Sequence, residues 1–509
     1  MKVIWILLLF YMSVGLCIIS TSHAATLTSP TCNATDVQTK INQAKNGDTV
    51  LVPPGNCTWN TQVDIGSKAI RLQGAGMNEA SPTKIEITKN FMLQFLDPGA
   101  GRKSSLTGFY FVNNLADWNG GIRIASAVGS VRVHHNRFYT GPHAVARMLF
   151  LSGHILVDNN LFDGIKNNQC FFIHNLGDNI AAFKKPVGWG QNFSDHVDWV
   201  YVENNTFQQT CNSPSAGNDE IFDIWGAGKL VFRYNTVING SFNNHSTCWS
   251  GAGNPGVYAI EMYGNNFIVQ NGCVTKYMGT LMGGTMLLHN NNIRLYGTGY
   301  VDMNYWNQGE TVWDMNLWLD SRSKDTTHNC PGNLWQLCDG SKNMFCSGST
   351  STTWYTCNAA NNSCASSGTN YGTCTMKRCS NSWTLCSNDS QCAGGTCSKY
   401  FDDLTTDPSN KTGYRCFNGT GAGQLLPDGT IDLDPVYLWN NAIYKCNADG
   451  SNCKYYKRVG LTRDISVNVK LGRDIIDNGT TPKPGYFPFN YPHPLSAPAP
   501  PQNIRIRSN

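Results

Sequence analysis

The residues best suited to chemistry include the acidic ones of GNDEIFDIW, residues 217–225, which an arginine, a histidine and another glutamate follow along the chain. Two carboxyl groups several ångströms apart can act as general acid and general base on a glycosidic bond, and carboxylates also bind calcium. The pattern predicts such a site across neighbouring coils. The alternative is an acidic edge in which the arginine is a structural ion-pair partner. The candidate catalytic residues are Asp219, Glu220, Asp223, Arg233, His245 and Glu261.

A second group of polar and aromatic residues lies in HNLGDNIAAFKKPVGWGQNFSDHVDW, residues 174–199. Binding residues are often found on loops that a rigid scaffold holds, indole rings suit stacking on sugars, and lysines attract acidic polymers. We expect this loop to bind an acidic polysaccharide; the alternative is a solvated loop whose tryptophans pack against the scaffold. The candidate binding residues are His174, Lys184, Lys185, Trp189, His196 and Trp199. No metal site is assigned, because His134 and His135 should point to opposite faces of a strand.

These candidates must be positioned by a phrase that recurs between residues 131 and 293, an apolar stretch closed by Asn, any residue and an apolar residue. The phrase asparagines are separated by 24, 45, 30, 30 and 26 positions. One coil of a parallel β-helix needs roughly 20–30 residues, so four steps fit one coil each. The 45-residue step fits two coils, or one coil with a long loop. The asparagines are Asn136, Asn160, Asn205, Asn235, Asn265 and Asn291.

Alternating apolar residues in each phrase predict short strands, and the Gly, Asn, Asp, Ser and Thr between phrases suit turns. The fold class is therefore all-β, a parallel β-helix solenoid. Stacked asparagines can hydrogen-bond one another along its axis and can adopt the left-handed conformation of a sharp corner. We interpret this column as scaffold rather than as a binding site. A second column, two positions later, is expected inside the core: Phe138, Phe162, Phe207, Val237, Phe267 and Ile293.

The N-terminus predicts export. Lys2 precedes an apolar run from Val3 to Ile19 and a small-residue cleavage site, which is typical of a secretory signal peptide. No later stretch is long and apolar enough to cross a bilayer, so a membrane-spanning protein is not expected. Charged residues make up 14% of the chain and the formal net charge is +4, without a Lys/Arg block. The electrostatic pattern of a nucleic-acid-binding protein is therefore missing.

The cysteines agree with export. Of 20 cysteines, Cys17 lies in the predicted signal peptide and eleven lie between residues 330 and 416. This density predicts disulfides rather than a zinc module, because paired C-x-x-C knuckles are missing. Local pairs are expected for Cys32–Cys57 and Cys446–Cys453. An odd number, nineteen, remains after removal of the signal peptide, so we expect a monomer with one free thiol or a disulfide-linked assembly.

The two ends of the solenoid also have sequence patterns. A short amphipathic helix with Val37, Ile41 and Ala44 on one face would cap the first coil, as solenoids require. The phrase resumes late in the chain with Asn441 and Ile443 in the two columns. An aromatic and proline-rich segment then follows, which we expect to pack over the last coil. The expected divisions are 1–24, signal peptide; 25–320, β-helix with its cap; 321–416, disulfide-rich insertion; 417–495, last coils and C-terminal cap; and 496–509, disordered tail.

Several stretches carry a resemblance to a known group: TDVQTKINQAKNGDTVLVPPGNCTW, RLQGAG, the NN-x-F phrases, FRYNTV and GRDII with PGYFPFNYPHPL. Over most of its length outside residues 321–416, the chain resembles secreted right-handed parallel β-helix proteins of the pectate-lyase-like superfamily. The resemblance implies a right-handed solenoid and, where such proteins cleave glycans, a site in an exterior groove. It doesn't imply one activity, because the superfamily includes lyases, hydrolases, esterases, epimerases and non-catalytic adhesins.

The leading functional prediction is a secreted polysaccharide lyase or glycoside hydrolase that acts on an acidic polysaccharide, with calcium as the cofactor to consider. The competing prediction is a non-catalytic cell-surface or adhesion protein that binds a glycan. Neither the arginine and aspartate-based calcium set of pectate lyases nor the Asp-Asp and Gly-His-Gly set of their hydrolytic relatives is found. A separation of more than about 10 Å between the carboxylates of Asp223 and Glu261, or their placement on opposite faces, would exclude the paired-carboxylate mechanism.

Overall fold

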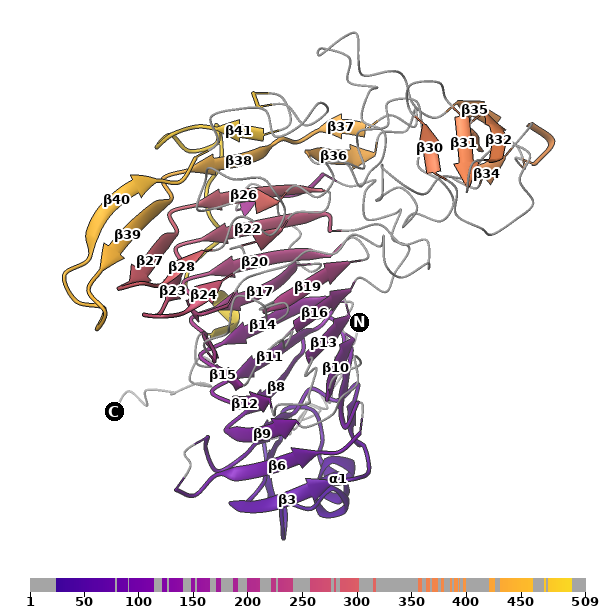
Figure 1. Ribbon diagram of the computed structural model, residues 1–509. Coiled ribbons are helices and arrows are strands. Elements are labelled where there is room, and N and C mark those ends of the chain that lie inside the picture. Colours follow the sequence, from indigo (N-terminus) through magenta and orange to yellow (C-terminus); the bar gives the residue numbers. More distant parts are fainter. Residues whose placement is uncertain are drawn as a thin grey trace, which may run out of the picture.

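A computed structural model gives the structure of the chain (Figure 1). Between residues 356 and 399 it describes short segments only, and elsewhere it describes the ranges that follow. They are 24–77, 80–89, 91–113, 121–125, 128–140, 148–151, 153–164, 171–174, 186–190, 199–210, 221–225, 228–240, 257–275, 279–280, 284–301, 315–316, 421–425, 431–460, 471–472 and 475–496.

Three long sheets form a right-handed parallel β-helix, as predicted. Sheet A has twelve strands, all paired in parallel. In spatial order these are β1 (Thr26–Thr28), β2 (Thr49–Leu51), β5 (Arg71–Gln73), β8 (Lys103–Thr107), β11 (Ser130–His134), β14 (His154–Asp158), β17 (Trp199–Glu203), β20 (Lys229–Arg233), β22 (Ala259–Tyr263), β26 (Thr285–His289), β38 (Val436–Trp439) and β41 (Ile475–Asp477).

Sheet B follows sheet A in each coil, and sheet C precedes sheet A. The strands of sheet B are β3 (Gly55–Trp59), β6 (Thr83–Ile87), β9 (Phe109–Asn113), β12 (Arg137–Thr140), β15 (Leu161–Gly164), β18 (Thr206–Gln209), β21 (Thr236–Ile238), β23 (Asn266–Val269), β27 (Asn292–Tyr296), β39 (Ala442–Cys446) and the antiparallel β40 (Lys454–Arg458). Those of sheet C are β19 (Phe222–Trp225), β16 (Phe171–His174), β13 (Met148–Leu151), β10 (Ile122–Ala125), β7 (Leu93–Leu96) and β4 (Val63–Gly66).

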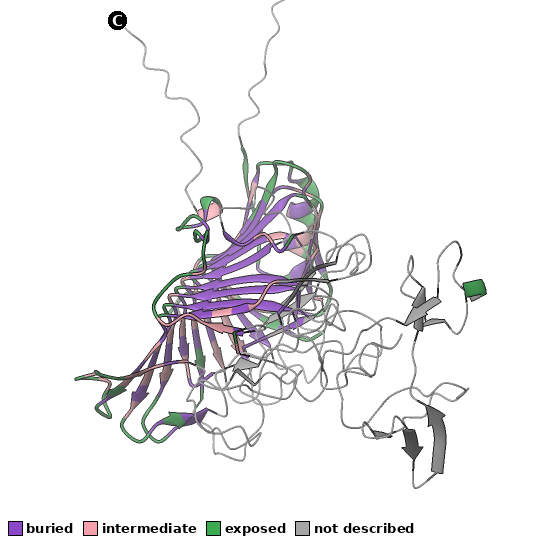
Figure 2. Ribbon diagram, turned by 90° about the horizontal axis from the view of Figure 1, so that it is seen from above, coloured by how far each residue is buried: buried purple, intermediate pink, exposed green. Residues whose placement is uncertain are grey.

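Stacked equivalent residues build the core, because each coil adds one strand to a sheet in register with the strand before it. Phe138 pairs with Phe162, and Phe162 with Phe207, so their rings stack with centroids 4.9 and 4.8 Å apart. Apolar residues alternate with outward residues along each strand, which follows from the two-residue period of a strand. Figure 2 shows the strands of the solenoid mostly in the colour of buried residues.

The predicted asparagine ladder is confirmed. The backbone N–H of each column asparagine donates to the side-chain oxygen of the next, at 2.9 Å from Asn136 to Asn160 and 3.1 Å from Asn291 to Asn441. The left-handed residue of the corner, however, is the one before the column asparagine, such as Tyr234 with φ 55° or Asn290 with φ 53°. The column residue can therefore keep both its amide and its backbone N–H in the ladder.

The pairing of strands also resolves the long steps in the repeat. β14 pairs directly with β17, so the 45-residue step is one coil with a long loop. β26 pairs directly with β38 and β27 with β39, while β29 (Met315–Asn316) still pairs in parallel with β25 (Gly279–Thr280). The chain therefore leaves the solenoid after β29 and returns at Val436. Only short strands are described within the intervening cysteine-rich segment, for example β31 (Ser363–Ser366).

The first coil is capped as predicted. Helix α1 (Ala34–Gln43) buries Ala34, Val37 and Ile41 against the end of the stack. The Lys68 ammonium donates to three carbonyl oxygens at the C-terminus of the helix, where the helix dipole favours a cation. The predicted disulfides Cys32–Cys57 and Cys446–Cys453 are both present. The predicted signal peptide, like the tail beyond residue 496, lies outside the described residues.

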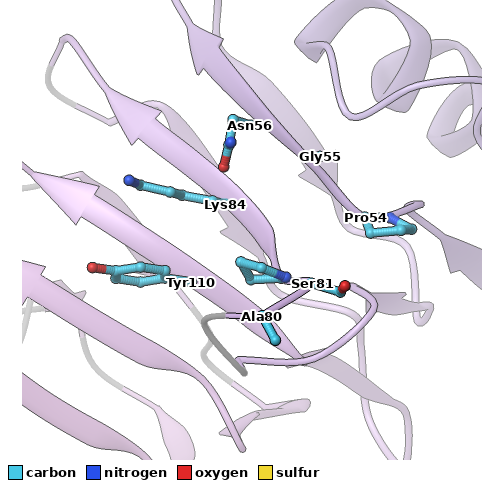
Figure 3. A pocket seen from close by; sticks show the side chains of 8 residues that line it. Pro54, Gly55, Asn56, Ala80, Ser81, Lys84 and Tyr110 are labelled. Carbon is cyan, nitrogen blue, oxygen red and sulfur yellow. The ribbon is translucent and has the colours of Figure 1, made fainter.

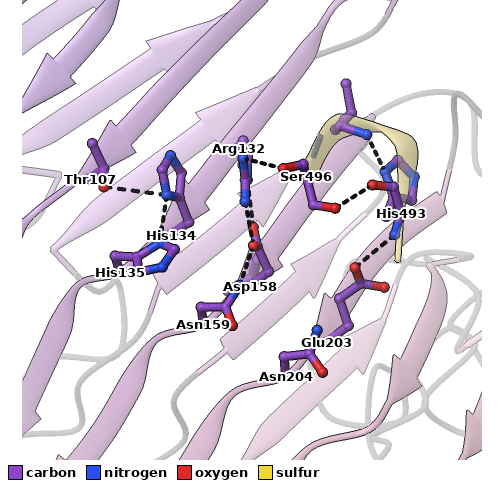
Figure 4. A network of polar contacts seen from close by, with 12 residues as sticks. Thr107, Arg132, His134, His135, Asp158, Asn159, Glu203, Asn204, His493 and Ser496 are labelled. Atoms are coloured by element: carbon purple, nitrogen blue, oxygen red, sulfur yellow. Dashed lines mark hydrogen bonds and ion pairs between the residues drawn. The ribbon is translucent and has the colours of Figure 1, made fainter. Parts of the chain in front are cut away.

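The C-terminal segment, residues 485–496 and here called the C-terminal strap, lies along the outward face of sheet A. Its Tyr486 contacts Trp439 in β38, with ring centroids 5.6 Å apart. The strap doesn't stop at this last coil, as the sequence led us to expect, but continues back towards the N-terminus as far as Lys103 in β8. Figure 4 shows Ser496 and His493 of the strap above Arg132 and Glu203 of the sheet. The strap thus covers most of the width of sheet A.

Candidate functional site

The outward face of sheet A carries two of the predicted catalytic residues, Arg233 and Glu261, and both are buried. Arg233 in β20 and Glu203 in the neighbouring β17 form an ion pair of 2.6 Å, and both side chains are 0% exposed. Arg132 and Asp158 form a second pair, also at 2.6 Å, with the aspartate fully buried. Charges removed from water in this way must be satisfied by partners, since an unpaired buried charge is costly.

Arg233 has all of its partners in the sheet and the strap. Beyond Glu203, its guanidinium donates to the hydroxyl of Tyr263 at 2.8 Å and to the carbonyl oxygens of Phe489 and Asn490 at 2.8 and 2.7 Å. Burial by itself lowers the pKa of Arg233, but Tyr263 and Glu203 outweigh it and the pKa is raised. Arg233 therefore forms a structural ion pair. This is the arrangement that the sequence analysis gave as the alternative to a catalytic role.

Glu261, in β22, is also fully buried. Its carboxyl oxygens accept hydrogen bonds from the backbone N–H of Gly190 at 2.6 Å and from the hydroxyl of Tyr486 at 2.7 Å. Burial raises the pKa of Glu261 to about 8, against the lowering effect of these two bonds and of Arg233. Gly190 has φ 55° and touches the strap, and a Cβ there would collide with the carbonyl oxygen of Phe487. Glu261 thus ties the segment 186–190 and the strap to sheet A.

The predicted catalytic residues that the structure describes lie on two different sheets. Asp223 lies in β19 of sheet C, where it pairs with Phe172, whereas Arg233 and Glu261 lie in sheet A. The expected alignment of Asp223 with Glu261 on neighbouring strands is therefore not found. Three predicted members lie outside the described residues: Asp219, Glu220 and His245. The catalytic assignment itself stays a prediction.

The predicted sugar-stacking tryptophans are packed against the solenoid. Trp199 is 0% exposed, and its ring lies 5.5 Å from that of Phe489 in the strap. Trp189 is buried as well, and its indole N–H donates to the carboxylate of Asp434 at 2.6 Å. His174 lies in β16 of sheet C, opposite Trp225. The remaining predicted binding residues, Lys184, Lys185 and His196, lie outside the described residues.

His134, the last residue of β11, and His135, which follows it, do not point apart as the sequence suggested. His135 takes the left-handed conformation, with φ 54°, and turns its ring back so that its Nδ1 lies 2.8 Å from that of His134 (Figure 4). Burial, with smaller effects of Arg132 and His135, lowers the pKa of His134 to about 3. Within the described ranges, no group of three or more His, Cys, Asp or Glu side chains could hold a metal ion.

The outward face of sheet B presents a site that the sequence reasoning missed. An open hollow of about 590 Å³ lies over β3, β6 and β9 at the N-terminal end of the sheet. Figure 3 shows the side chains of Asn56, Lys84 and Tyr110 standing side by side on these three strands. The lining residues are Pro54, Gly55, Asn56, Ala80, Ser81, Pro82, Lys84 and Tyr110.

Two cations flank the tyrosine of this hollow. The Lys84 ammonium lies 5.5 Å from the centroid of the Tyr110 ring, and the guanidinium carbon of Arg137 in β12 lies 4.5 Å from it. Arg137 in turn pairs with Asp163 in β15 at 2.6 Å, and both of these side chains remain 15 to 18% exposed. Partial burial, together with the negative charge of Asp163, raises the pKa of Tyr110, so the phenol stays neutral. The result is a row of flat and cationic groups open to solvent.

The signal for this row was present in the repeat. Each outward residue of sheet B directly precedes a core residue, as Tyr110 precedes Phe111 and Arg137 precedes Phe138. Reading the position before the core column would have revealed a tyrosine between two cations. In the described part of the chain, no helix has the length and apolar character needed to span a membrane. Comparison with protein-family models and with curated proteins yields no match.

Proposed function

We propose that the protein is an exported β-helix, similar in fold to the pectate-lyase-like superfamily, that binds an acidic polysaccharide on the outward face of sheet B. One observation carries the proposal, the row of Lys84, Tyr110 and Arg137 beside an open hollow. The two disulfides are compatible with an oxidising compartment. In contrast, the charges on sheet A are used to hold the strap.

The chemistry of the row suits a sugar that carries carboxylate or sulfate groups. The exposed part of the Tyr110 ring can contact the apolar face of a sugar, as aromatic rings with a polar handle do. Lys84 and Arg137 would pair with anionic groups on either side, and Asn56 offers an amide donor and acceptor to hydroxyl groups. A neutral polysaccharide would offer no anionic group to the Lys84 ammonium beside the ring, so the site should favour acidic polymers.

Calorimetric titration of the secreted chain tests this proposal with polygalacturonate, alginate, a sulfated polysaccharide and a neutral glucan. We expect binding to the acidic polymers only, weakened about 3- to 10-fold by Tyr110→Ala and by Lys84→Gln. Lys45→Gln removes the same charge from an exposed position beside α1 and should leave binding unchanged. Equal affinities for the parent chain and both hollow variants would overturn the proposal.

Cleavage of the same polymers is a second candidate, supported by the register of sheet C. β16 and β19 are neighbours, and the pairing of Phe172 with Asp223 and of His174 with Trp225 places His174 and Asp223 two positions apart on adjacent strands. Histidine and aspartate are residue types that can act as acid and base in such a cleavage. Absorbance of unsaturated uronate products, with calcium or with a chelator, tests a lyase, and a reducing-sugar assay tests a hydrolase. Activity that Asp223→Asn leaves intact would contradict this candidate. If no acidic polymer yields a product, cleavage is excluded and only the binding proposal remains.

A further inference from the structure

At the opposite end of sheet B, β39 and β40 form a hairpin that the acidic-polymer site does not include. It projects from the C-terminal end of the solenoid in Figure 1. The disulfide Cys446–Cys453 closes it, and the turn is held by hydrogen bonds from Asn447 to the Ser451 carbonyl at 2.8 Å and from Ser451 to the Asp449 carboxylate at 2.9 Å. The hairpin is thus a rigid element whose side chains are presented in a fixed arrangement.

The hairpin exposes two tyrosines among lysines. Tyr455 is 61% and Tyr456 is 50% exposed, so both rings are available to solvent. In the described part of the chain, β40 is the last strand of sheet B. The Lys445 ammonium lies 4.0 Å from the centroid of the Tyr456 ring, and that of Lys457 lies 5.8 Å from it. A pre-arranged ring between two cations therefore recurs here, as around Tyr110.

The charge balance of the hairpin favours an anionic partner. Residues 436–460 contain four basic residues and one acidic residue, Asp449. Arg458 is engaged with the carboxylate of Asp477, which lies beyond that range, and Asp449 accepts hydrogen bonds from Ser451. Three lysines, Lys445, Lys454 and Lys457, therefore supply the positive charge of the surface.

We propose that this hairpin is a second binding site for a polysaccharide that carries carboxylate or sulfate groups. The exposed rings are tyrosines, which suit the apolar faces of sugars, and they come without the exposed Leu, Ile, Phe or Trp that membrane insertion would use. From β9 to β39 there are seven strand steps in sheet B, or about 34 Å at the spacing of neighbouring strands. The hairpin is therefore spatially separate from the hollow and does not require it.

The test measures binding of the full secreted chain to heparin, polygalacturonate, vesicles of phosphatidylserine and phosphatidylcholine, and a single-stranded oligonucleotide. The triple variant Lys445→Gln, Lys454→Gln, Lys457→Gln should lose about 10-fold in affinity for the polysaccharides, and Tyr456→Ala should lose about 3-fold. The matched control is Lys45→Gln. Intact disulfide mass and an unchanged melting temperature show that the hairpin variants fold.

The outcomes separate the two sites. If the triple variant weakens binding and Tyr110→Ala doesn't, the hairpin stands and the hollow fails; the reverse result overturns the hairpin alone. The hairpin proposal is also overturned if the triple variant binds polysaccharides like the parent chain. Binding to vesicles or oligonucleotide that depends on the three lysines, without polysaccharide binding, would overturn it as well.

Discussion

The outward faces of sheets A and B carry similar side chains that differ in their exposure to solvent. Each holds an arginine and a carboxylate on neighbouring strands, paired at 2.6 Å, but Arg233 and Glu203 are fully buried while Arg137 and Asp163 stay partly exposed. The strands and the spacing are alike, and the difference is the C-terminal strap that lies on sheet A. Outward position in a β-helix coil therefore doesn't make a residue available to a ligand.

The difference also shows in how the two arginines are satisfied. Arg233 donates to a carboxylate, a phenol and two backbone carbonyls, as a cation removed from water requires. Arg137 pairs with the carboxylate of Asp163 and lies over the ring of Tyr110, where solvent can still reach it. The charges of sheet A thus hold the strap, whereas those of sheet B are the ones that the proposed binding function would use.

The largest expected effect comes from breaking the buried pair. Glu203→Ala leaves the Arg233 guanidinium buried without its carboxylate and removes the acceptor of the His493 backbone N–H, so it should lower the free energy of unfolding by about 3–5 kcal/mol. Asp163→Ala removes the same kind of partner on sheet B and should cost less than about 1 kcal/mol. Urea unfolding measures both. Equal losses in the two variants would contradict the contrast between the faces.

A slightly smaller effect is expected from the strap itself. Phe489 is 5% exposed and packs on Trp199 and Tyr201, so Phe489→Ala should cost about 3 kcal/mol and shift tryptophan emission to the red. Phe487, two residues earlier in the strap, is 60% exposed, and Phe487→Ala should change stability by less than about 0.5 kcal/mol. Thermal unfolding followed by fluorescence compares them. A strap that contributes nothing to stability would make the two variants indistinguishable.

The repeat explains how much of the fold could be predicted from the sequence. The asparagine and apolar columns predicted the strands, their order and the ladder, because stacking in a solenoid is a local, periodic property. The same columns located Asn441, 150 positions after Asn291, in the next coil of the ladder. The left-handed corner was assigned one residue too late, because the residue before the column asparagine varies in type and includes Tyr234, which seldom adopts this conformation.

The candidate site was harder to predict because the cover of sheet A comes from distant parts of the chain. Glu261 contacts Gly190, 71 positions earlier, and Tyr486, 225 positions later, and neither segment follows the repeat. Because the sequence does not reveal these contacts, Glu261 in β22 was expected to be accessible to a substrate. On sheet B, Tyr110 and Arg137 were within reach, since their outward position follows from the core column alone.

The buried carboxyl group of Glu261 should make the free energy of unfolding depend on pH, and this dependence distinguishes sheet A from sheet B. The pKa of Glu261 is raised from 4.5 to about 8 by burial, so its contribution to stability is fully present below pH 4.5 and is lost as pH rises through about 8. We expect the free energy of unfolding to decline across this window, and Glu261→Gln to flatten the decline. Glu86→Gln, at an exposed position of sheet B, should leave it unchanged. Unfolding midpoints between pH 4 and 9 provide the measurement. A wild-type decline that survives in Glu261→Gln would assign it to another group.

The smallest expected effect is on sheet B, where Arg137 can be replaced by a side chain of the same charge but a different shape. Arg137→Lys retains the cation but loses the planar group that lies 4.5 Å from the Tyr110 centroid, so affinity for an acidic polysaccharide should fall about 2- to 3-fold. Stability should hardly change, because the pair with Asp163 is partly solvated. Arg102→Lys makes the same exchange at an exposed position before β8 and should affect neither quantity. If Arg137→Lys lowers stability and leaves affinity intact, the charges of sheet B serve folding as those of sheet A do.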